Sequence, residues 1–155
     1  MKVGQFMQEI KYTTDLNSKS YQDGLNIRKQ VFIKEQGVSE SLEISDEDKC
    51  EHVTLYSDGL AVATARFFVT DDNGIHIQRV AVLKEYRHKN LATNLLTDMI
   101  TKIKKNSNNY KYIILGAQDH AQEFYIKLGF KVIGDQYTEA GILHHDMKLT
   151  LGDNY

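Results

Sequence analysis

Three consecutive basic side chains, Arg87, His88 and Lys89, stand immediately before a stretch that has the apolar spacing of a helix. Its apolar residues recur at positions that share one helix face: Leu91, Leu95, Leu96, Met99, Ile100 and Ile103. The first amides of a helix have no partner within it and carry the positive end of its dipole, so they attract phosphate. The sequence therefore predicts a phosphate-binding site at the start of this helix, with the basic side chains beside it.

The strand that precedes this turn contains a change of phase. Ile75 and Ile77 occupy odd positions, whereas Val80 and Val82 occupy even ones. One extra residue near Gln78-Arg79 would restore the register, as a β-bulge does. A bulge leaves backbone groups unpaired, so they can bind an extended ligand. The two features together predict a long ligand with a phosphate end at the helix and an amide-bearing arm along the strand.

Turn residues and apolar spacing indicate the elements that must position this turn. Asp-Gly at 58–59 and Asn-Gly at 73–74 are strong hairpin signals, and they predict an antiparallel meander. The continuous apolar run 112–115 favours a buried strand, parallel to the one before the helix. The predicted strands are 8–13, 52–56, 60–69, 75–82, 112–115, 131–133 and 144–149.

Two further helices are predicted. Asn17 or Ser18 can cap an early helix, and Gly37 is a natural C-terminal stop for it. A short helix follows Gly116 and ends at Gly129. The residues expected on its inner face are Ala121, Phe124, Tyr125 and Leu128.

The segment after the early helix is acidic. Its only basic residues are Lys34 and Lys49, and its carboxylates are Glu35, Glu40, Glu43, Asp46, Glu47, Asp48 and Glu51. One interpretation is a solvated surface loop. The other is an electronegative lip that attracts a cationic amine. The single cysteine, Cys50, lies in this segment, where carboxylates would raise the pKa of its thiol, so we do not expect it to be a nucleophile.

The chain of 155 residues is long enough for one domain, 1–155, and too short for two comfortable ones. Its hydrophobic content of 41% and charged content of 26% are ordinary globular values. A formal net charge of −2 argues against a nucleic-acid partner, since phosphate neutralisation needs a basic surface. Because no secretory leader and no apolar run of membrane length can be seen, we expect a cytoplasmic protein without a membrane partner.

The run Arg87-His88-Lys89-Asn90-Leu91-Ala92 resembles the (Arg/Gln)-x-x-Gly-x-(Gly/Ala) motif of the GNAT N-acetyltransferase superfamily, which holds the pyrophosphate of acetyl-CoA. Asn90 replaces the first glycine, and asparagine is one of the few residues that tolerate a positive φ. The resemblance implies acetyl-CoA as co-substrate. The residues that it implies for the cofactor are Val80, Ala81 and Val82, through backbone amides, and Arg87, His88, Lys89, Asn90, Leu91, Ala92 and Thr93.

A second stretch is similar to the Asn-x-x-Ala and Phe-Tyr-x-x-x-Gly-Phe pattern that follows the fifth strand in the same superfamily. Ala121, Tyr125, Gly129 and Phe130 match this pattern, and Gln118 stands at the Asn position. The resemblance implies that Gln118 contributes to the cofactor site. It also implies that Tyr125 donates a proton to the departing thiolate. The alternative is a core tyrosine whose hydroxyl is satisfied by the backbone.

Four further pieces resemble the YjcF/ElaA-like subgroup of the superfamily. They are Arg28-x-x-Val31-Phe32-x-x-Glu35-Gln36, Ala63-Thr64-Ala65-Arg66, Arg79-Val80-Ala81-Val82 and Glu139-Ala140-Gly141-Ile142-x-His144. With this resemblance the predicted fold class is α/β: a GNAT-like mixed, mostly antiparallel sheet of six to seven strands flanked by helices on both faces. An exposed C-terminal strand could pair with a second copy, so a homodimer is a further expectation.

The function that the resemblance implies is an acetyl-CoA-dependent N-acetyltransferase, in which a primary amine attacks the thioester directly in a ternary complex. The amine would belong to a small molecule or a protein, and we expect a small molecule. The alternative is a non-catalytic module that senses acyl-CoA, which the departures at Asn90 and Gln118 favour. The histidines lack a metal-ligand spacing, so no metal is predicted. The amine also needs a base, for which the sequence leaves five candidates: Asp48, Glu51, His52, His120 and His144.

Overall fold

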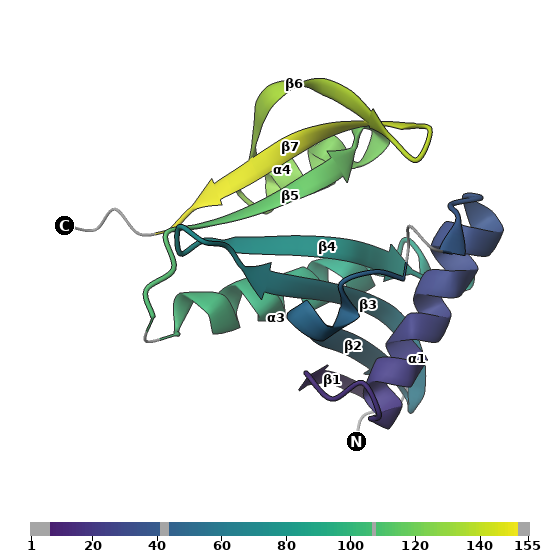
Figure 1. The fold of residues 1–155 in the computed structure, drawn as a ribbon. Coiled ribbons are helices and arrows are strands. Elements are labelled where there is room, and N and C mark those ends of the chain that lie inside the picture. The colour runs from purple at the N-terminus through teal and green to yellow at the C-terminus, as the bar shows by residue number, and fades with distance from the viewer. Residues whose placement is uncertain (1–6, 41–43, 107, 152–155) are drawn as a thin grey trace. The chain divides into compact units, whose positions relative to one another are not determined.

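The protein is described by a computed structural model that covers residues 7–40, 44–106 and 108–151 (Figure 1). The strands are β1 (Gln8–Thr13), β2 (Glu51–Ser57), β3 (Leu60–Val69), β4 (Ile75–Val82), β5 (Tyr112–Gln118), β6 (Lys131–Glu139) and β7 (Ile142–Thr150). The longer helices are α1 (Lys19–Arg28), the π-helix η1 (Lys29–Glu35), α3 (Leu91–Lys104) and α4 (Gln122–Lys127). Short 3₁₀ segments lie in the connections: η2 (Glu47–Lys49), η3 (Lys84–Tyr86) and η4 (Asp119–Ala121).

The strands form a seven-stranded mixed sheet in the order β1-β2-β3-β4-β5-β7-β6. The pairs β1–β2, β5–β7 and β6–β7 are antiparallel, and β4–β5 is parallel, which confirms the predicted sheet. β1, β3 and β4 have the predicted bounds, whereas β5 and β6 extend further, to Gln118 and Glu139. Nearly all of β6 is exposed on both faces, so it has no alternating apolar pattern from which its length could be predicted.

The C-terminal strand β7 is paired on both edges, with β5 and with β6. The expectation of an exposed C-terminal strand is therefore wrong. β6 comes earlier in the chain but takes the outer position of the sheet. The register between β6 and β7 shifts between Ile133 and Tyr137, where Gly134 has a φ of 71°.

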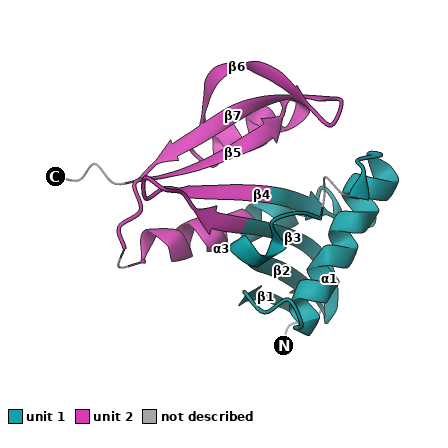
Figure 2. Ribbon diagram, in the orientation of Figure 1, with its two compact units in different colours: residues 1–66, 79–95 teal, residues 67–78, 96–155 magenta. Residues whose placement is uncertain are grey.

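The chain divides into two compact units (Figure 2). Unit 1 consists of residues 1–66 and 79–95, and unit 2 of residues 67–78 and 96–155. The boundaries fall inside β3, β4 and α3, so each of these three elements contributes to both units.

In unit 1, α1 lies against the strands through close polar contacts. Ser18 caps the helix as predicted, since its Oγ accepts a hydrogen bond from Tyr21 N at 3.2 Å. Further along, a Cβ added at Gly24 would lie 2.8 Å from the hydroxyls of Thr54 and Thr64, on β2 and β3. Glycine is therefore required where the helix crosses these strands.

The early helix changes type halfway. The sequence predicts one helix up to Gly37, but α1 ends at Arg28 and the chain continues as the π-helix η1. Gln36 N donates to Val31 O at 3.1 Å, which is one residue further back than in an α-helix. Gly37, with a φ of 75°, ends the helical segment as predicted. Val31 on η1 belongs to a buried cluster with Ala81 of β4.

In unit 2, the ladder between β5 and β7 separates two sets of side chains. Ala117 pairs with His145, and Gln118 pairs with His144, so each pair lies on its own face of the sheet. Gln122 of α4 places its Nε2 2.9 Å from His145 Nδ1. α4 therefore covers the face of Ala117 and His145, and Gln118 and His144 lie on the opposite face.

The apolar face predicted for α3 is confirmed. All of its members are buried: Leu91, Leu95, Leu96, Met99, Ile100 and Ile103. This burial sets the rotation of the helix about its axis and hence the direction of its first turn. Within the described ranges, no helix is long and apolar enough to cross a membrane.

Candidate functional site

The end of β4 is irregular at Arg79, whose φ is 58°. A left-handed residue inside a strand changes which face the following side chains occupy, and the sequence predicts such a break near Gln78-Arg79. Beyond it Ala81 is buried, whereas Val80 and Val82 are half-buried. The three backbone units that the resemblance implies for the cofactor therefore follow directly after the break.

The loop between β4 and α3 passes through two left-handed residues. His88 has a φ of 65° and Asn90 a φ of 62°. Asn90 thus adopts the conformation that glycine takes most easily. Asn94 N donates to Asn90 O at 3.0 Å. The bond from Asn94 is the first of the helical pattern, so the amides of residues 91–93 have no acceptor within α3 and are the unsatisfied donors of its N-terminus. Leu91 is buried, and the side chains of the other two are half-buried.

Arg87 has partners on two other segments of unit 1. Its Nη1 and Nη2 donate to Glu35 Oε2 and Oε1, at 2.6 and 2.7 Å, and its Nε donates to Val82 O at 3.0 Å. The side chains of Arg87 and Glu35 are 33% and 35% exposed. Hydrogen bonds from Arg87 hold the pKa of the Glu35 carboxyl below its usual range. The guanidinium expected to bind phosphate is thus already paired with a carboxylate.

The other two basic side chains of the loop, His88 and Lys89, are exposed. Lys89 Nζ lies 5.7 Å from the centre of the Tyr86 ring, within the range of a cation–π contact. These two side chains are therefore accessible to an anion at the start of α3.

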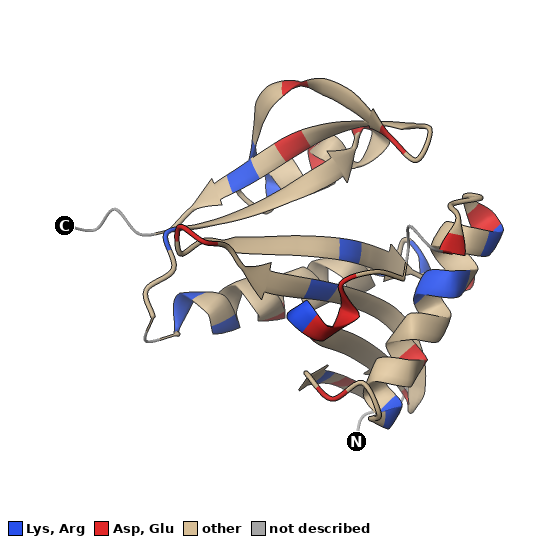
Figure 3. Cartoon of the chain, viewed as in Figure 1, with Lys and Arg blue, Asp and Glu red and all other residues tan. Residues whose placement is uncertain are grey.

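The carboxylate of Glu47 lies between two buried arginines of unit 1. Arg28 Nη1 and Nη2 donate to its Oε1 and Oε2, at 2.6 and 3.1 Å, and Arg66 Nη1 also donates to Oε2. Tyr21 Oη donates to Oε1 at 2.8 Å, and His52 Nε2 lies 2.8 Å from the backbone oxygen of Glu47. Arg28 and Arg66 are 2% and 1% exposed. Figure 3 shows basic residues on α1 and β3 and acidic residues in the segment between α1 and β2.

Neither interpretation of the acidic segment describes Glu47, which is turned inward, although Asp48 is exposed. Burial alone would raise the pKa of Glu47, but the hydrogen bond and charge of Arg28, the hydrogen bond of Tyr21 and the charge of Arg66 together hold the pKa low. Cys50 is buried too, and burial raises the pKa of its thiol. Glu43 lies outside the described residues.

The candidate bases differ in their surroundings: Asp48, Glu51, His52, His120 and His144. Asp48 is exposed and Glu51 half-buried. His52 is buried in the Glu47 cluster, and burial lowers its pKa. His120 is exposed, with its Nε2 2.6 Å from Gln118 Oε1. His144 is buried in unit 2.

Tyr125 is buried in unit 2, where its ring meets those of Phe124 and Phe130 edge-on, with centroids 5.0 and 5.9 Å away. Phe130 N donates to Tyr125 O at 3.1 Å, a return made possible by Gly129 with a φ of 105°. In the part of the chain that the structure describes, the Tyr125 hydroxyl has no hydrogen-bond partner. Burial raises the pKa of Tyr125. The phenol therefore keeps its proton. No backbone group of the described chain accepts a hydrogen bond from it.

A polar network fixes the start of α4. Asp119 Oδ1 accepts from His145 Nδ1 at 2.9 Å and from Gln122 Nε2 at 3.0 Å, and Asp119 Oδ2 accepts from Gln136 Nε2 at 2.6 Å. The hydrogen bond from His145 is the main cause of the low pKa of Asp119. The network joins α4, which carries Tyr125, to β6 and β7. Sequence reasoning missed it, because only Asp119 and Gln122 have a helical spacing.

Each unit thus collects part of the predicted site. Unit 1 holds the strand end Val80–Val82 and the loop with its helix start, and the amides and basic side chains of the loop and helix start are suited to an anionic ligand. Unit 2 holds Gln118 and Tyr125, an amide side chain and a phenol able to donate a proton. Among the described residues, no three His, Cys, Asp or Glu side chains converge as metal ligands would.

Comparisons with known proteins agree with the motifs. A family model for the acetyltransferase (GNAT) domain matches residues 14–151. The chain is 32% identical over 143 residues to a UPF0039 protein of Schizosaccharomyces pombe, with 91% of this chain and 95% of that protein covered. It is 30% identical over 133 residues to the uncharacterized N-acetyltransferase YjcF of Bacillus subtilis, with 84% and 93% covered.

A solved structure supports the same relationship. The crystal structure of Escherichia coli ElaA superposes with a TM-score of 0.79 at 27% sequence identity, covering 92% of this chain and 99% of that one. The predicted resemblance to YjcF and ElaA is therefore confirmed, both in sequence and in fold.

Proposed function

The chain belongs to the GNAT acetyltransferase family, and we propose that it transfers an acetyl group from acetyl-CoA to a primary amine of a small molecule. The amine attacks the thioester directly, in a ternary complex. In this proposal 1–155 acts as a single catalytic domain in the cytoplasm, without a metal.

The unsatisfied amides at the start of α3 support the assignment of the pyrophosphate to this turn. Asn90, His88 and Lys89 surround them, and the left-handed Asn90 keeps the turn that the family motif makes with glycine. The arm of the cofactor would follow Val80–Val82, whose amides polarise the thioester carbonyl. Gln118 would contact the cofactor from β5. The conformation of Asn90 also removes the main reason to prefer a non-catalytic sensor.

One observation carries the proposal of an enzyme: the side chain of Tyr125 is buried, and its hydroxyl has no hydrogen-bond partner among the described residues. A buried tyrosine with a purely structural role normally satisfies its hydroxyl. A phenol that keeps its proton and lacks a partner is suited to protonate a thiolate as it leaves. We assign this role to Tyr125.

Thiol release with acetyl-CoA and a panel of small primary amines tests the proposal, with mass spectrometry to identify the amide. Tyr125→Phe should lower kcat by about 100-fold or more, since general acid catalysis typically contributes that much. Tyr110→Phe is a matched control with unchanged turnover, because the Tyr110 hydroxyl bonds only the side chain of Asn108 in the described chain.

Thermal unfolding with acetyl-CoA separates binding from turnover. A ligand at a hundred times its Kd stabilises a fold by about 2.7 kcal/mol, which moves the midpoint by several degrees. A shift without turnover on any amine would point to a sensor instead. The absence of a shift with acetyl-CoA would contradict both functions.

The acceptor and the oligomeric state need their own measurements. Faster turnover of small amines than of peptides with a free amino terminus would support a small-molecule acceptor. A homodimer that forms by strand pairing would use β6, which is an edge of the sheet and exposes Val132 and Ile133. Light scattering over a dilution series would show whether this dimer exists.

A further inference from the structure

His144 on β7 is held in one tautomer. The residue is 7% exposed, and its Nδ1 lies 2.7 Å from Ile142 O. A carbonyl oxygen only accepts, so Nδ1 carries the proton and donates it. In the neutral ring, Nε2 is therefore the nitrogen with an available electron pair. The ring of Tyr137 stacks on it, with centroids 5.6 Å apart and planes at 19°, which fixes the direction of Nε2.

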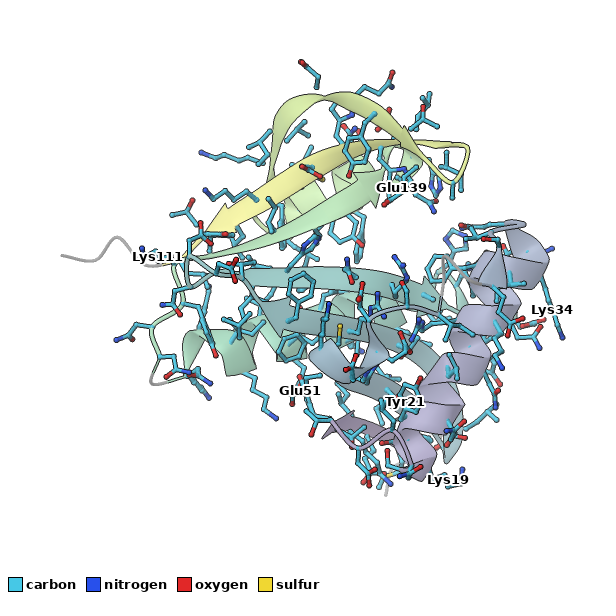
Figure 4. The ribbon with its side chains drawn as sticks, viewed as in Figure 1. Lys19, Tyr21, Lys34, Glu51, Lys111 and Glu139 are labelled. Atoms are coloured by element: carbon cyan, nitrogen blue, oxygen red, sulfur yellow. The ribbon has the colours of Figure 1, made fainter. Side chains whose placement is uncertain are left out.

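The Nε2 atom faces a carboxylate. Glu139 Oε2 lies 3.9 Å from it, beyond hydrogen-bond distance, and the Glu139 side chain is 64% exposed. Within the described chain no donor or acceptor bonds Nε2 itself. Figure 4 shows Glu139 at the hairpin between β6 and β7. A carboxylate in this position attracts a cationic amine.

The other titratable groups that face this region come from three elements of unit 2. Tyr137 of β6 donates its Oη proton to Asp146 Oδ1 on β7, at 2.7 Å. From η4, His120 contacts the side chain of Gln118, which pairs with His144 across the ladder. Glu139 is therefore the charged group with the shortest described distance to His144, and Asp146 adds a second negative charge on the same face.

His144 and the helix that carries Tyr125 lie on opposite faces of the β5–β7 ladder. His144 shares its face with Gln118, the cofactor residue proposed on β5. Gln122 of α4 contacts His145, whose side chain is on the other face. Gln118 and His144 form the last pair of this ladder, so a reacting carbon at this end can be approached from both faces, by His144 on one and by Tyr125 on the other.

We propose that His144 is the general base for the acceptor amine and that Glu139 attracts the cationic amine to it. The inference rests on the acetyl transfer proposed above and identifies the residue that activates the amine. An ammonium group gives one proton to His144 Nε2. Its electron pair then forms the C–N bond with the acyl carbon, and the C–S bond breaks with its pair on sulfur.

The remaining proton transfers balance the reaction. Tyr125 gives its phenolic proton to the departing sulfur, which yields the free thiol of coenzyme A. The second amine proton is released as the amide forms and restores Tyr125 through solvent. His144 passes the first proton to water. The net products are the amide, the thiol and one proton.

The rival histidines have less suitable contacts. His52 places its Nε2 against the backbone oxygen of Glu47, and its ring forms a T-shaped pair with the ring of Tyr21, with centroids 4.7 Å apart. The Nε2 of His120 is engaged by the side chain of Gln118. His144 combines burial, a fixed tautomer and an unbonded Nε2 within the described residues.

Turnover of two different nucleophiles distinguishes a general base from a histidine with only a structural role. A primary alkylamine is an ammonium ion at neutral pH and needs a base, whereas hydroxylamine is largely unprotonated there. His144→Gln should lower kcat/KM for the alkylamine by about 100-fold or more. For hydroxylamine it should lower kcat/KM by only about 10-fold. It should also remove the acidic limb of the pH profile. His76→Gln, which removes an imidazole of β4 that packs against Phe68, should keep that limb.

Glu139→Gln adds an independent readout. Without the carboxylate the substrate ammonium ion is attracted less strongly, so KM should rise for the alkylamine and stay nearly unchanged for hydroxylamine. An acidic limb that persists in His144→Gln, or equal losses for the two nucleophiles, would overturn the proposal.

Circular dichroism checks that His144→Gln folds. If it does not fold, the test uses the wild-type protein. NMR should then show the His144 ring titrating over the same pH range as the acidic limb of the alkylamine profile. A different pH range would overturn the assignment. Failure of the proposed function looks different, since the wild-type protein would then release no thiol with any amine.

Discussion

The guanidinium of Arg87 forms a bidentate ion pair with the carboxylate of Glu35, which lies 52 residues earlier in the chain. The pair connects the loop before α3 to the end of the π-helix η1. Each residue belongs to a separate motif of the family resemblance. Arg87 also bonds Val82 O, so one side chain holds three segments of unit 1 together.

We expect Glu35→Gln to lower the Kd for acetyl-CoA. The substitution removes a negative charge next to the loop proposed for the pyrophosphate and releases the guanidinium to bind it. Arg87→Ala should raise the Kd by about tenfold, the value of one charge-assisted hydrogen bond. Isothermal titration calorimetry at fixed salt measures both effects. Glu40→Gln is the matched control, because the side chain of Glu40 is exposed.

If Glu35→Gln and Arg87→Ala weakened acetyl-CoA binding to the same degree, the ion pair would act only by holding the loop in place. The guanidinium would then have no part in binding the phosphate.

The second prediction concerns the buried carboxylate of Glu47. Glu47→Gln leaves the guanidinium groups of Arg28 and Arg66 without their shared counter-charge. Breaking a buried ion pair in this way destabilises a fold by about 3–5 kcal/mol. Urea unfolding should show this loss, whereas Asp48→Asn, an exposed neighbour on η2, should change stability by less than about 0.5 kcal/mol. Similar curves for the two variants would show that the cluster contributes little.

The third prediction is a pH dependence caused by His52. Burial lowers its pKa from the ordinary 6.5, so just below pH 6.5 the unfolded chain binds a proton that the folded chain does not. The free energy of unfolding should therefore fall as the pH drops from 6.5 toward the folded pKa. His52→Gln should flatten this part of the curve in urea unfolding at a series of pH values. His120→Gln, at an exposed histidine, should leave the slope as it is; an unchanged slope in His52→Gln would refute the assignment.

The fourth prediction tests the left-handed Asn90. Alanine tolerates a φ of 62° less well than asparagine, so Asn90→Ala should destabilise the protein by about 1 kcal/mol. Asn90→Gly should keep the turn and lower the Kd for acetyl-CoA, because it removes a Cβ close to the proposed ligand. Thermal unfolding with and without acetyl-CoA measures both quantities.

Asn73→Ala is the control for this strain. Asn73 has a φ of 68° but lies in the turn before β4 and bonds the backbone of Asn108 and Asn109. It should lose stability in the same way while its affinity for acetyl-CoA stays unchanged. A change in affinity there would mean that the effect of Asn90 is not local.

Local patterns in the sequence were sufficient for much of the fold. The Asp-Gly turn places β2 and β3, Ser18 caps α1, and the apolar face of α3 is buried as its spacing predicts. The change of phase near Gln78-Arg79 gave the position of the left-handed residue in β4. These features depend on neighbours a few positions apart, so the order of residues alone determines them.

The tertiary structure decided the partners of the charged and polar groups. Glu35 was one of several carboxylates in an acidic run, and only folding brought it to Arg87. Glu47 turned inward because two arginines distant in sequence were buried beside it, and His144 came to face Glu139 through the pairing of β6 with β7. No local period encodes such pairs, because their members meet only when the strands and helices pack.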